Sequence, residues 1–246
     1  QGLYSSLRNY LDDSGFPPVF NPLDSAGLTA VAPPDPALEN SPTVAAASPM
    51  VVKVRTMAWG CDRQIEGSGF VYAPQYVLTN AHVVAGESSV SVLSGGGSLS
   101  AKVVLYDDQR DVAVLHVPGL KAPALPFADA AAVTNDDAIV LGYPQDGPYD
   151  ARSARVSDHE TLHGKDIYGA NFVDRDVYAI RALVRGGNSG GPLLTPDGQV
   201  LGMVFAAAVG DDETGFVLSD AELRAAGIDA AVGATKSVGT GACTPS

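Results

Sequence analysis

The most informative stretch of the 246-residue sequence is Gly187-Asn188-Ser189-Gly190-Gly191-Pro192. It lies between two apolar runs that are typical of strands, residues 177–184 and 192–208. A serine flanked by glycines in a tight loop can hold its hydroxyl clear of bulky neighbours while backbone N–H groups converge beside it. This pattern is typical of a serine that acts as the nucleophile in acyl transfer.

A serine hydroxyl is a weak nucleophile at neutral pH and needs a base and a third group that orients the base. The sequence offers His82 after an apolar run over 70–78, and Asp111 at the start of a β-branched run. The chain order histidine, aspartate, serine is that of chymotrypsin-type enzymes and differs from the orders in subtilisin and the α/β-hydrolases. The stretch around Ser189 is no α/β-hydrolase elbow, because strand signals surround it and no helix signal follows.

Five motifs occur in the order in which trypsin-like serine proteases carry them. They are Gly67-Ser68-Gly69-Phe70, Thr79-Asn80-Ala81-His82, Asp111-Val112-Ala113-Val114-Leu115, Gly142-Tyr143-Pro144 and Gly187-Asn188-Ser189-Gly190-Gly191-Pro192-Leu193-Leu194. A chance match to five ordered motifs is far rarer than a match to a lone glycine motif. Over about residues 50–218 the sequence therefore resembles the compact bacterial HtrA-like group of that family. Its proline-rich leader and cysteine positions also resemble the membrane-anchored, periplasmic acid-resistance serine proteases of mycobacteria.

The expected fold is all-β, with two six-stranded antiparallel barrels of the chymotrypsin type and a short C-terminal helix. The resemblance implies the strand number, whereas the alternating apolar runs and turn clusters such as Ser94-Gly95-Gly96-Gly97-Ser98 predict the barrels themselves. The predicted parts are an extended leader over 1–49, barrels over 50–118 and 136–218 joined by a linker over 119–135, and a helix and tail over 219–246. Apart from a possible short helix over 4–11, prolines are expected to prevent regular structure in the leader. A capping box at Ser219-Asp220-Ala221-Glu222 predicts a helix that runs to about residue 230.

By resemblance, His82 takes the proton of Ser189, Asp111 orients His82, and the N–H groups of Gly187 and Ser189 form the oxyanion hole. The chemistry requires no metal and no organic cofactor. Asn188 stands where zymogen-activated relatives carry an aspartate that captures a new N-terminal amine, so activation of that kind is not expected.

The same resemblance places the base of the specificity pocket at Leu183 and its wall at Phe205, Ala206 and Ala207. Leucine offers no carboxylate for lysine or arginine, so we expect cleavage after medium-sized apolar residues. Phe205 stands where relatives commonly place a hydroxyl against the triad carboxylate, which leaves the support of Asp111 open.

Composition narrows the setting of the protein. The chain has 15 basic and 28 acidic residues and a net charge of −13, which opposes binding to nucleic acid or anionic lipid. Its 46% of hydrophobic residues excludes global disorder. Neither a membrane span nor a signal peptide is found, and the start at Gln1 suggests a fragment whose anchor or export signal lies upstream. We expect a monomeric periplasmic domain, attached to a membrane only through such an anchor.

The two cysteines, Cys61 and Cys243, could form one bridge or stay as reduced thiols. Because Cys61 precedes the first barrel motif and Cys243 lies in a small-residue tail, we favour a bridge between the tail and the first barrel. A bridge implies an oxidising compartment.

The remaining histidines are given structural roles. His159 and His163 are four residues apart and could be a metal pair or a pH sensor, but their polar surroundings favour a solvated loop. His116 is expected to be a packed or edge residue. The polar region 145–176 is expected to be a mobile loop beside the site.

These observations predict a serine endopeptidase that acts on cell-envelope proteins, and the resemblance implies a role in acid or oxidative stress. Two alternatives remain: a catalytically silent barrel that serves as a binding module, and an esterase for small acyl esters.

Overall fold

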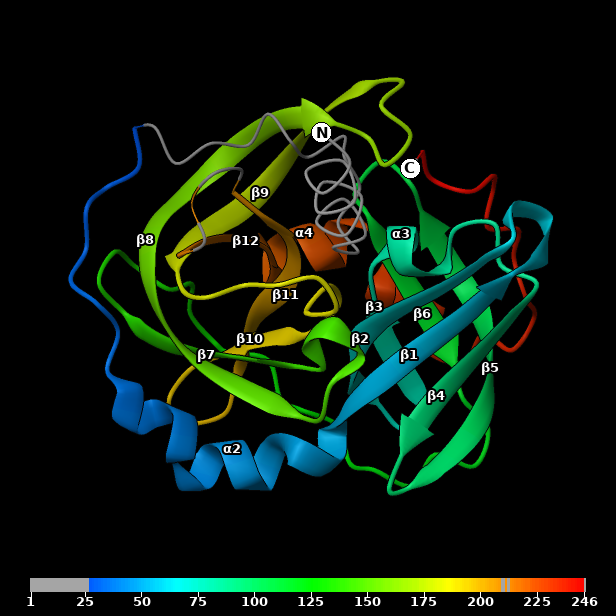
Figure 1. The fold of residues 1–246 in the computed structure, drawn as a ribbon, viewed down its shortest axis with the longest axis horizontal. Coiled ribbons are helices and arrows are strands. Elements are labelled where there is room, and N and C mark those ends of the chain that lie inside the picture. Colours follow the sequence, from blue (N-terminus) through cyan, green and yellow to red (C-terminus); the bar gives the residue numbers. More distant parts are fainter. Residues whose placement is uncertain (1–26, 209–210, 212, 246) are drawn as a thin grey trace, which may run out of the picture.

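Strands, some of which alternate buried and more exposed residues, close into two antiparallel barrels of six strands each (Figure 1). The structure is a computed structural model that describes residues 27–208, 211 and 213–245. The predicted all-β fold with two six-stranded barrels is confirmed.

The first barrel has the strand order β1-β2-β3-β6-β5-β4. Its strands are β1 (Val51–Ala58), β2 (Arg63–Ala73), β3 (Tyr76–Thr79), β4 (Ser89–Ser94), β5 (Gly97–Asp107) and β6 (Val112–His116). Gly95 and Gly96 join β4 to β5 with φ angles of 57° and 79°. A two-residue hairpin loop of this kind favours glycine at both positions, so the glycine cluster in the sequence encodes this turn.

The second barrel repeats this topology, because its order reads β7-β8-β9-β12-β11-β10 around the barrel. Its strands are β7 (Asp137–Gly142), β8 (Asp150–Lys165), β9 (Phe172–Arg181), β10 (Pro192–Leu194), β11 (Val200–Ala207) and β12 (Thr214–Ser219). Each barrel encloses its own apolar core. A third cluster, which includes Phe70, Leu78, Leu141 and Phe205, lies where the barrels meet and fixes one barrel against the other.

The leader is more ordered than its prolines suggested. Residues 36–50 form three short helices, η2 (Pro36–Asn40), α2 (Pro42–Ala47) and η3 (Ser48–Met50), and each has proline at one of its first two positions. The prediction that proline prevents regular structure is therefore wrong here, because proline is favoured at the first position of a helix. The helix expected over 4–11 lies outside the described residues.

Two further expectations about helices and loops need correction. The C-terminal helix is divided into α4 (Asp220–Ala225) and α5 (Ile228–Ala231), because Gly227 adopts φ 90° between them. Ser219 caps α4 as predicted, accepting a hydrogen bond from the N–H of Glu222 at 3.1 Å.

The polar region over 145–176 is mostly a long hairpin of β8 and β9 and is not a loop. His159 and His163 lie on β8, where each faces an aspartate of β9. His159 Nε2 is 2.8 Å from Asp176, and His163 Nδ1 is 2.6 Å from Asp174. Cross-strand pairing between β8 and β9 thus accounts for these polar residues. Within the described residues, no group of three His, Cys, Asp or Glu side chains could hold a metal ion.

Candidate functional site

The residues predicted to carry the chemistry lie on three connections at the junction of the barrels. His82 lies on the single-turn helix α3 (Ala81–Val84) that follows β3, and Asp111 precedes β6 in the same barrel. Ser189 lies between β9 and β10 of the second barrel. All three are buried, with His82 2%, Asp111 0% and Ser189 1% exposed.

Asp111 holds His82 through both of its carboxylate oxygens. Oδ2 is 2.7 Å from Nδ1 of the imidazole, and Oδ1 accepts the backbone N–H of His82 at 2.9 Å. Asp111 has φ 64°, a left-handed conformation that is uncommon for residues other than glycine, and the Asn80 side chain donates to its carbonyl oxygen at 2.9 Å. With both oxygens engaged by His82, Asp111 does not depend on a hydroxyl at position 205.

A buried positive charge also lies near Asp111. Arg175 on β9 is 1% exposed and donates a hydrogen bond to the carbonyl oxygen of Gln109. Burial lowers the pKa of the Arg175 guanidinium, while the charges of Asp111 and Glu222 act in the opposite direction. The arginine was not identified from the sequence, because only the pairing of β8 and β9 brings its strand to this place.

Strand β2 contacts both the helix that carries His82 and the loop that carries Ser189. A side-chain Cβ at Gly67 would lie 2.8 Å from Val83 Cγ2 and 3.2 Å from the carbonyl oxygen of Ser189. The N–H of Ser68 donates to that same carbonyl at 2.8 Å. Glycine at 67 therefore leaves room for α3 and the serine loop to meet beside β2.

Asn188 accepts two hydrogen bonds within the loop around Ser189. The side chain of Asn188 accepts the N–H of Arg185 at 3.0 Å, and the carbonyl oxygen of Asn188 accepts the N–H of Gly191 at 2.8 Å. Asn188 therefore stabilises the loop from within. The hydroxyl of Ser189 makes no hydrogen bond within the described part of the chain.

Two N–H groups of this loop could stabilise an oxyanion. In the part of the chain that the structure describes, neither the N–H of Gly187 nor that of Ser189 donates to a backbone carbonyl. Gly187 has φ 91°, and a Cβ there would lie 2.6 Å from the carbonyl oxygen of Tyr143. Only glycine can combine this conformation with so close an approach.

The expected specificity residues are only partly accessible. Phe205 and Ala206 are 0% exposed, whereas Leu183 and Ala207 are half-buried. Phe205 belongs to the core between the barrels, so its side chain presents no surface to an open pocket in this conformation. Leu183 and Ala207 are the two predicted positions that a substrate side chain could contact.

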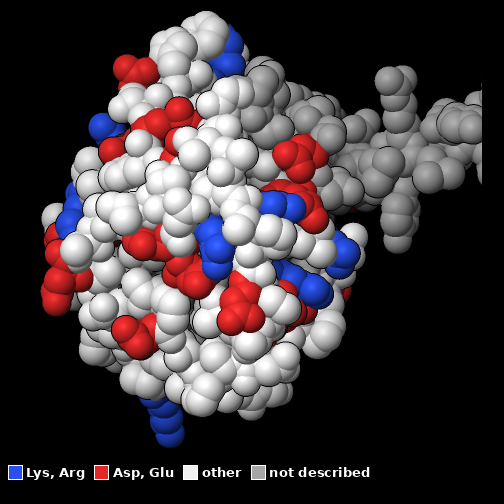
Figure 2. All heavy atoms as spheres, turned by 90° about the vertical axis from the view of Figure 1, so that its left-hand side faces the viewer, with Lys and Arg blue, Asp and Glu red and all other residues white. Residues whose placement is uncertain are grey.

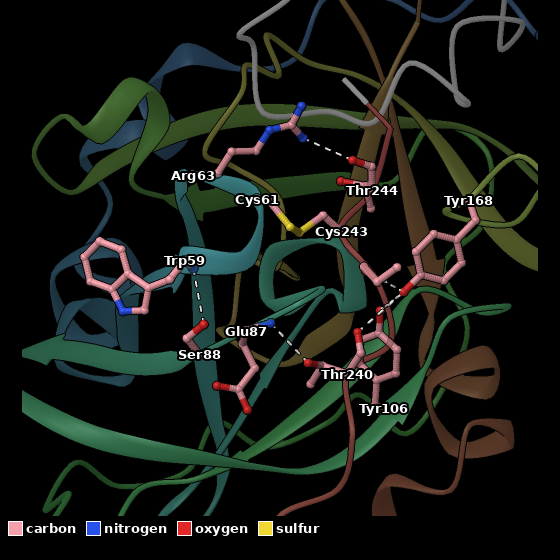
Figure 3. The surroundings of a disulfide bond; sticks show 11 residues. Trp59, Cys61, Arg63, Glu87, Ser88, Tyr106, Tyr168, Thr240, Cys243 and Thr244 are labelled. Carbon is pink, nitrogen blue, oxygen red and sulfur yellow. Dashed lines mark hydrogen bonds between the residues drawn. A yellow bond between two sulfur atoms is a disulfide. The ribbon is translucent and has the colours of Figure 1, made fainter.

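The predicted disulfide between Cys61 and Cys243 is present and spans 182 positions of the sequence (Figure 3). Around it the C-terminal tail binds the first barrel: Arg63 donates to the carbonyl oxygen of Thr244 at 3.0 Å, and Thr240 Oγ1 accepts the N–H of Glu87 at 3.1 Å. The tail therefore packs against the segment that directly follows α3.

The surface agrees with an acidic protein of mixed charge. On the face drawn in Figure 2, basic and acidic side chains are interspersed, and lysines and arginines do not gather into one continuous patch. Among the described residues, no helix is long and apolar enough to span a membrane.

Comparison with known proteins places the site in context. The trypsin-like peptidase domain matches residues 67–203, the segment that contains His82, Asp111 and Ser189. The serine protease Rv3671c of Mycobacterium tuberculosis is 52% identical over 238 residues, which are 96% of this chain and 59% of that protein. The chain thus spans less than two thirds of this relative's length.

Two further matches agree in fold and sequence. The crystal structure of the Rv3671c protease in its active form has a TM-score of 0.87, 50% sequence identity, and coverage of 92% of this chain and 99% of that one. The Do-like serine protease HtrA of Lactococcus lactis is 36% identical over 154 residues, which are 58% of this chain and 38% of that protein.

Proposed function

Because this chain belongs to the trypsin-like peptidase family, we propose that it is a serine endopeptidase that hydrolyses peptide bonds through an acyl-enzyme on Ser189. One observation carries the proposal: Asp111 holds the imidazole of His82 at 2.7 Å, and the helix that carries His82 meets the serine loop at Gly67. A base with a fixed tautomer beside a glycine-flanked serine is the arrangement that acyl transfer to serine requires.

The roles follow from this geometry. Asp111 accepts a hydrogen bond from Nδ1, which leaves Nε2 of His82 as the proton acceptor for Ser189 Oγ. Oγ attacks the peptide carbonyl carbon, and the N–H groups of Gly187 and Ser189 stabilise the oxyanion that forms. His82 then returns the proton to the leaving amine, and water hydrolyses the ester by the same route.

The proposed substrates are cell-envelope polypeptides, cut after medium-sized apolar residues, during acid or oxidative stress. The disulfide supports an extracytoplasmic location, because such bonds persist in oxidising compartments. We further propose a monomer that meets a membrane only through an anchor outside this chain.

Proteome-wide cleavage profiling tests this function. The chain and its Ser189→Ala variant are incubated separately with a cell-envelope protein extract, and new N-termini are identified by mass spectrometry. We expect new termini only with the unchanged serine. Identical profiles from the two proteins would favour a silent binding module, and turnover of small acyl esters without peptide cleavage would favour an esterase.

A further inference from the structure

A turn beside the serine loop has an unusual backbone. The 3-10 helix η5 (Pro144–Asp146) follows β7 and contains Gln145 with φ 54° and Asp146 with φ 53°. Two consecutive non-glycine residues in the left-handed region are rare, and they persist only where surrounding contacts hold them. The contacts that hold this turn therefore also affect the position of the serine loop, which the turn contacts.

The first barrel supplies the main contact. Lys53 on β1 donates from Nζ to the carbonyl oxygen of Asp146 at 2.8 Å and to its carboxylate at 2.5 Å. The Lys53 side chain is 12% exposed and that of Asp146 is 53% exposed, so the contact is shielded from water on the lysine side only. Hydrogen bonds to Glu66 and Lys53 hold the pKa of Asp146 below its ordinary value, which keeps its carboxylate charged at neutral pH.

The η5 turn also holds one peptide bond of the serine loop. The N–H of Gln145 donates to the carbonyl oxygen of Gly186 at 2.8 Å. In a planar trans peptide the C=O and the following N–H point in opposite directions, and no peptide bond among the described residues is cis. Gln145 therefore turns the N–H of Gly187 away from η5, and a flip of this peptide would reverse that N–H.

We propose that Lys53 is a positioning residue for the oxyanion hole, which holds η5 so that η5 fixes the Gly186–Gly187 peptide. The inference rests on the proposed function, in which the N–H of Gly187 stabilises the oxyanion. It assigns the first barrel a part in catalysis beyond His82 and Asp111, because Lys53 lies near the start of β1, the end of that strand that is next to the second barrel (Figure 1).

The test compares Lys53→Met with Lys165→Met. Lys165 is a matched control, because its Nζ lies over the ring of Phe172 at the end of the β8–β9 hairpin and both variants remove one positive charge. Each variant is measured for kcat, for KM, and for the rate of inactivation by a peptidyl phosphonate. The phosphonate adduct places an oxygen in the oxyanion hole.

In Lys53→Met we expect kcat and the inactivation rate to fall about tenfold, less than the roughly hundred- to thousandfold loss typical of removing a whole donor. KM should change less than about twofold, because the contact between Lys53 and η5 acts on the transition state and not on substrate binding. Lys165→Met should match the unchanged protein.

A second variant keeps the inference testable should Lys53→Met fail to fold. Asp146→Gly removes the carboxylate, keeps the carbonyl acceptor, and adopts the left-handed conformation without strain. We expect it to retain the fold and to show a smaller loss of kcat with KM unchanged. If Lys53→Met folds and has the same kcat as Lys165→Met, the inference is wrong. If Lys53→Met does not fold, the same result for Asp146→Gly would overturn it. Absence of phosphonate labelling in the unchanged protein would instead reject the proposed function.

Discussion

The buried hydroxyl of Ser68 donates a hydrogen bond of 2.6 Å to the carbonyl oxygen of Gly187. Ser68 Oγ also accepts the N–H of Tyr143 at 2.9 Å, so one side chain of β2 joins the end of β7 to the serine loop. Together with the contact between Gln145 and Gly186, this bridge sets the two peptide planes on either side of Gly187. The geometry of the proposed oxyanion hole thus depends on residues far from Ser189 in the sequence.

Replacing Ser68 with alanine should impair both stability and turnover. The change leaves a buried carbonyl and a buried N–H without this partner, at a cost of about 1–3 kcal/mol per group. Ser157→Ala is the matched control, because Ser157 Oγ also donates to a buried strand carbonyl, that of Ala179, at 2.9 Å. We expect both variants to lower the Tm, and only Ser68→Ala to lower the kcat of the folded protein. Equal kcat values in the two variants would show that the bridge is merely structural.

The disulfide should stabilise the fold mainly through the unfolded chain. A loop closed over 182 positions restricts the unfolded state by up to about 5 kcal/mol in the chain-entropy model, and measured values are often smaller. Reductant, or the pair Cys61→Ser and Cys243→Ser, should therefore lower the Tm and increase proteolysis of the C-terminal tail. Alkylation of the denatured, non-reduced protein should add no mass, and two modified thiols would contradict the bridge.

Sequence reasoning succeeded where local patterns encode the structure. The glycines at 67, 95, 96 and 187 mark close approaches and tight turns, and such positions can be recognised from short motifs. The barrels follow from runs of alternating residues, and the histidine, aspartate and serine motifs follow from their order along the chain. His82 and Asp111 are indeed brought together.

The sequence does not predict those features of the structure that depend on contacts between distant segments. The polar hairpin of β8 and β9 resembles a loop because its charged residues pair across strands, as His163 and Asp174 do. Prolines in the leader begin short helices that dock on the barrels, and docking is not visible in composition. The roles of Ser68 and Lys53 could not be inferred, because each acts on a loop more than 90 residues away.

The turn at the end of the β8–β9 hairpin should weaken in acid. Although burial acts in the opposite direction, hydrogen bonds from Ala170, Asn171 and Tyr168 hold the pKa of Asp166 below its ordinary value. A carboxyl group with a lowered folded-state pKa contributes stability above its unfolded-state pKa, about 3.9, and loses that contribution as pH falls through the folded-state pKa.

Asp166→Asn should therefore lower the Tm at pH 7. The free energy of unfolding should fall by about 1.5–3 kcal/mol, the range for hydrogen bonds to a charged group. The difference from the unchanged protein should shrink progressively below about pH 4. Asp174→Asn, which changes an exposed carboxylate of the same hairpin, should have little effect at either pH. A deficit that stays constant or grows on acidification would rule out this role for Asp166.

Cleavage should occur after medium-sized apolar residues. Leu183 offers no carboxylate, and a lysine or arginine side chain placed against it would strand a desolvated charge. Phe205 and Ala206 expose no surface, so Leu183 and Ala207 are the two predicted positions left to contact the side chain. A peptide library should show leucine, valine, alanine or methionine before the cut, and Leu183→Asp should shift the preference toward lysine and arginine. Dominant cleavage after basic residues by the unchanged protein would contradict the pocket assignment.

The central claim is that Ser189 is a nucleophile activated by His82 and Asp111. Its most direct test is reaction of the protein with a serine-directed phosphonate, followed by peptide mapping of the adduct by mass spectrometry. We expect a single phosphonylated residue, Ser189. Labelling should be absent in Ser189→Ala and should fall by orders of magnitude in His82→Ala, because the residues act as one unit. An unlabelled Ser189 in the folded protein, or labelling that is unaffected by loss of His82, would contradict it.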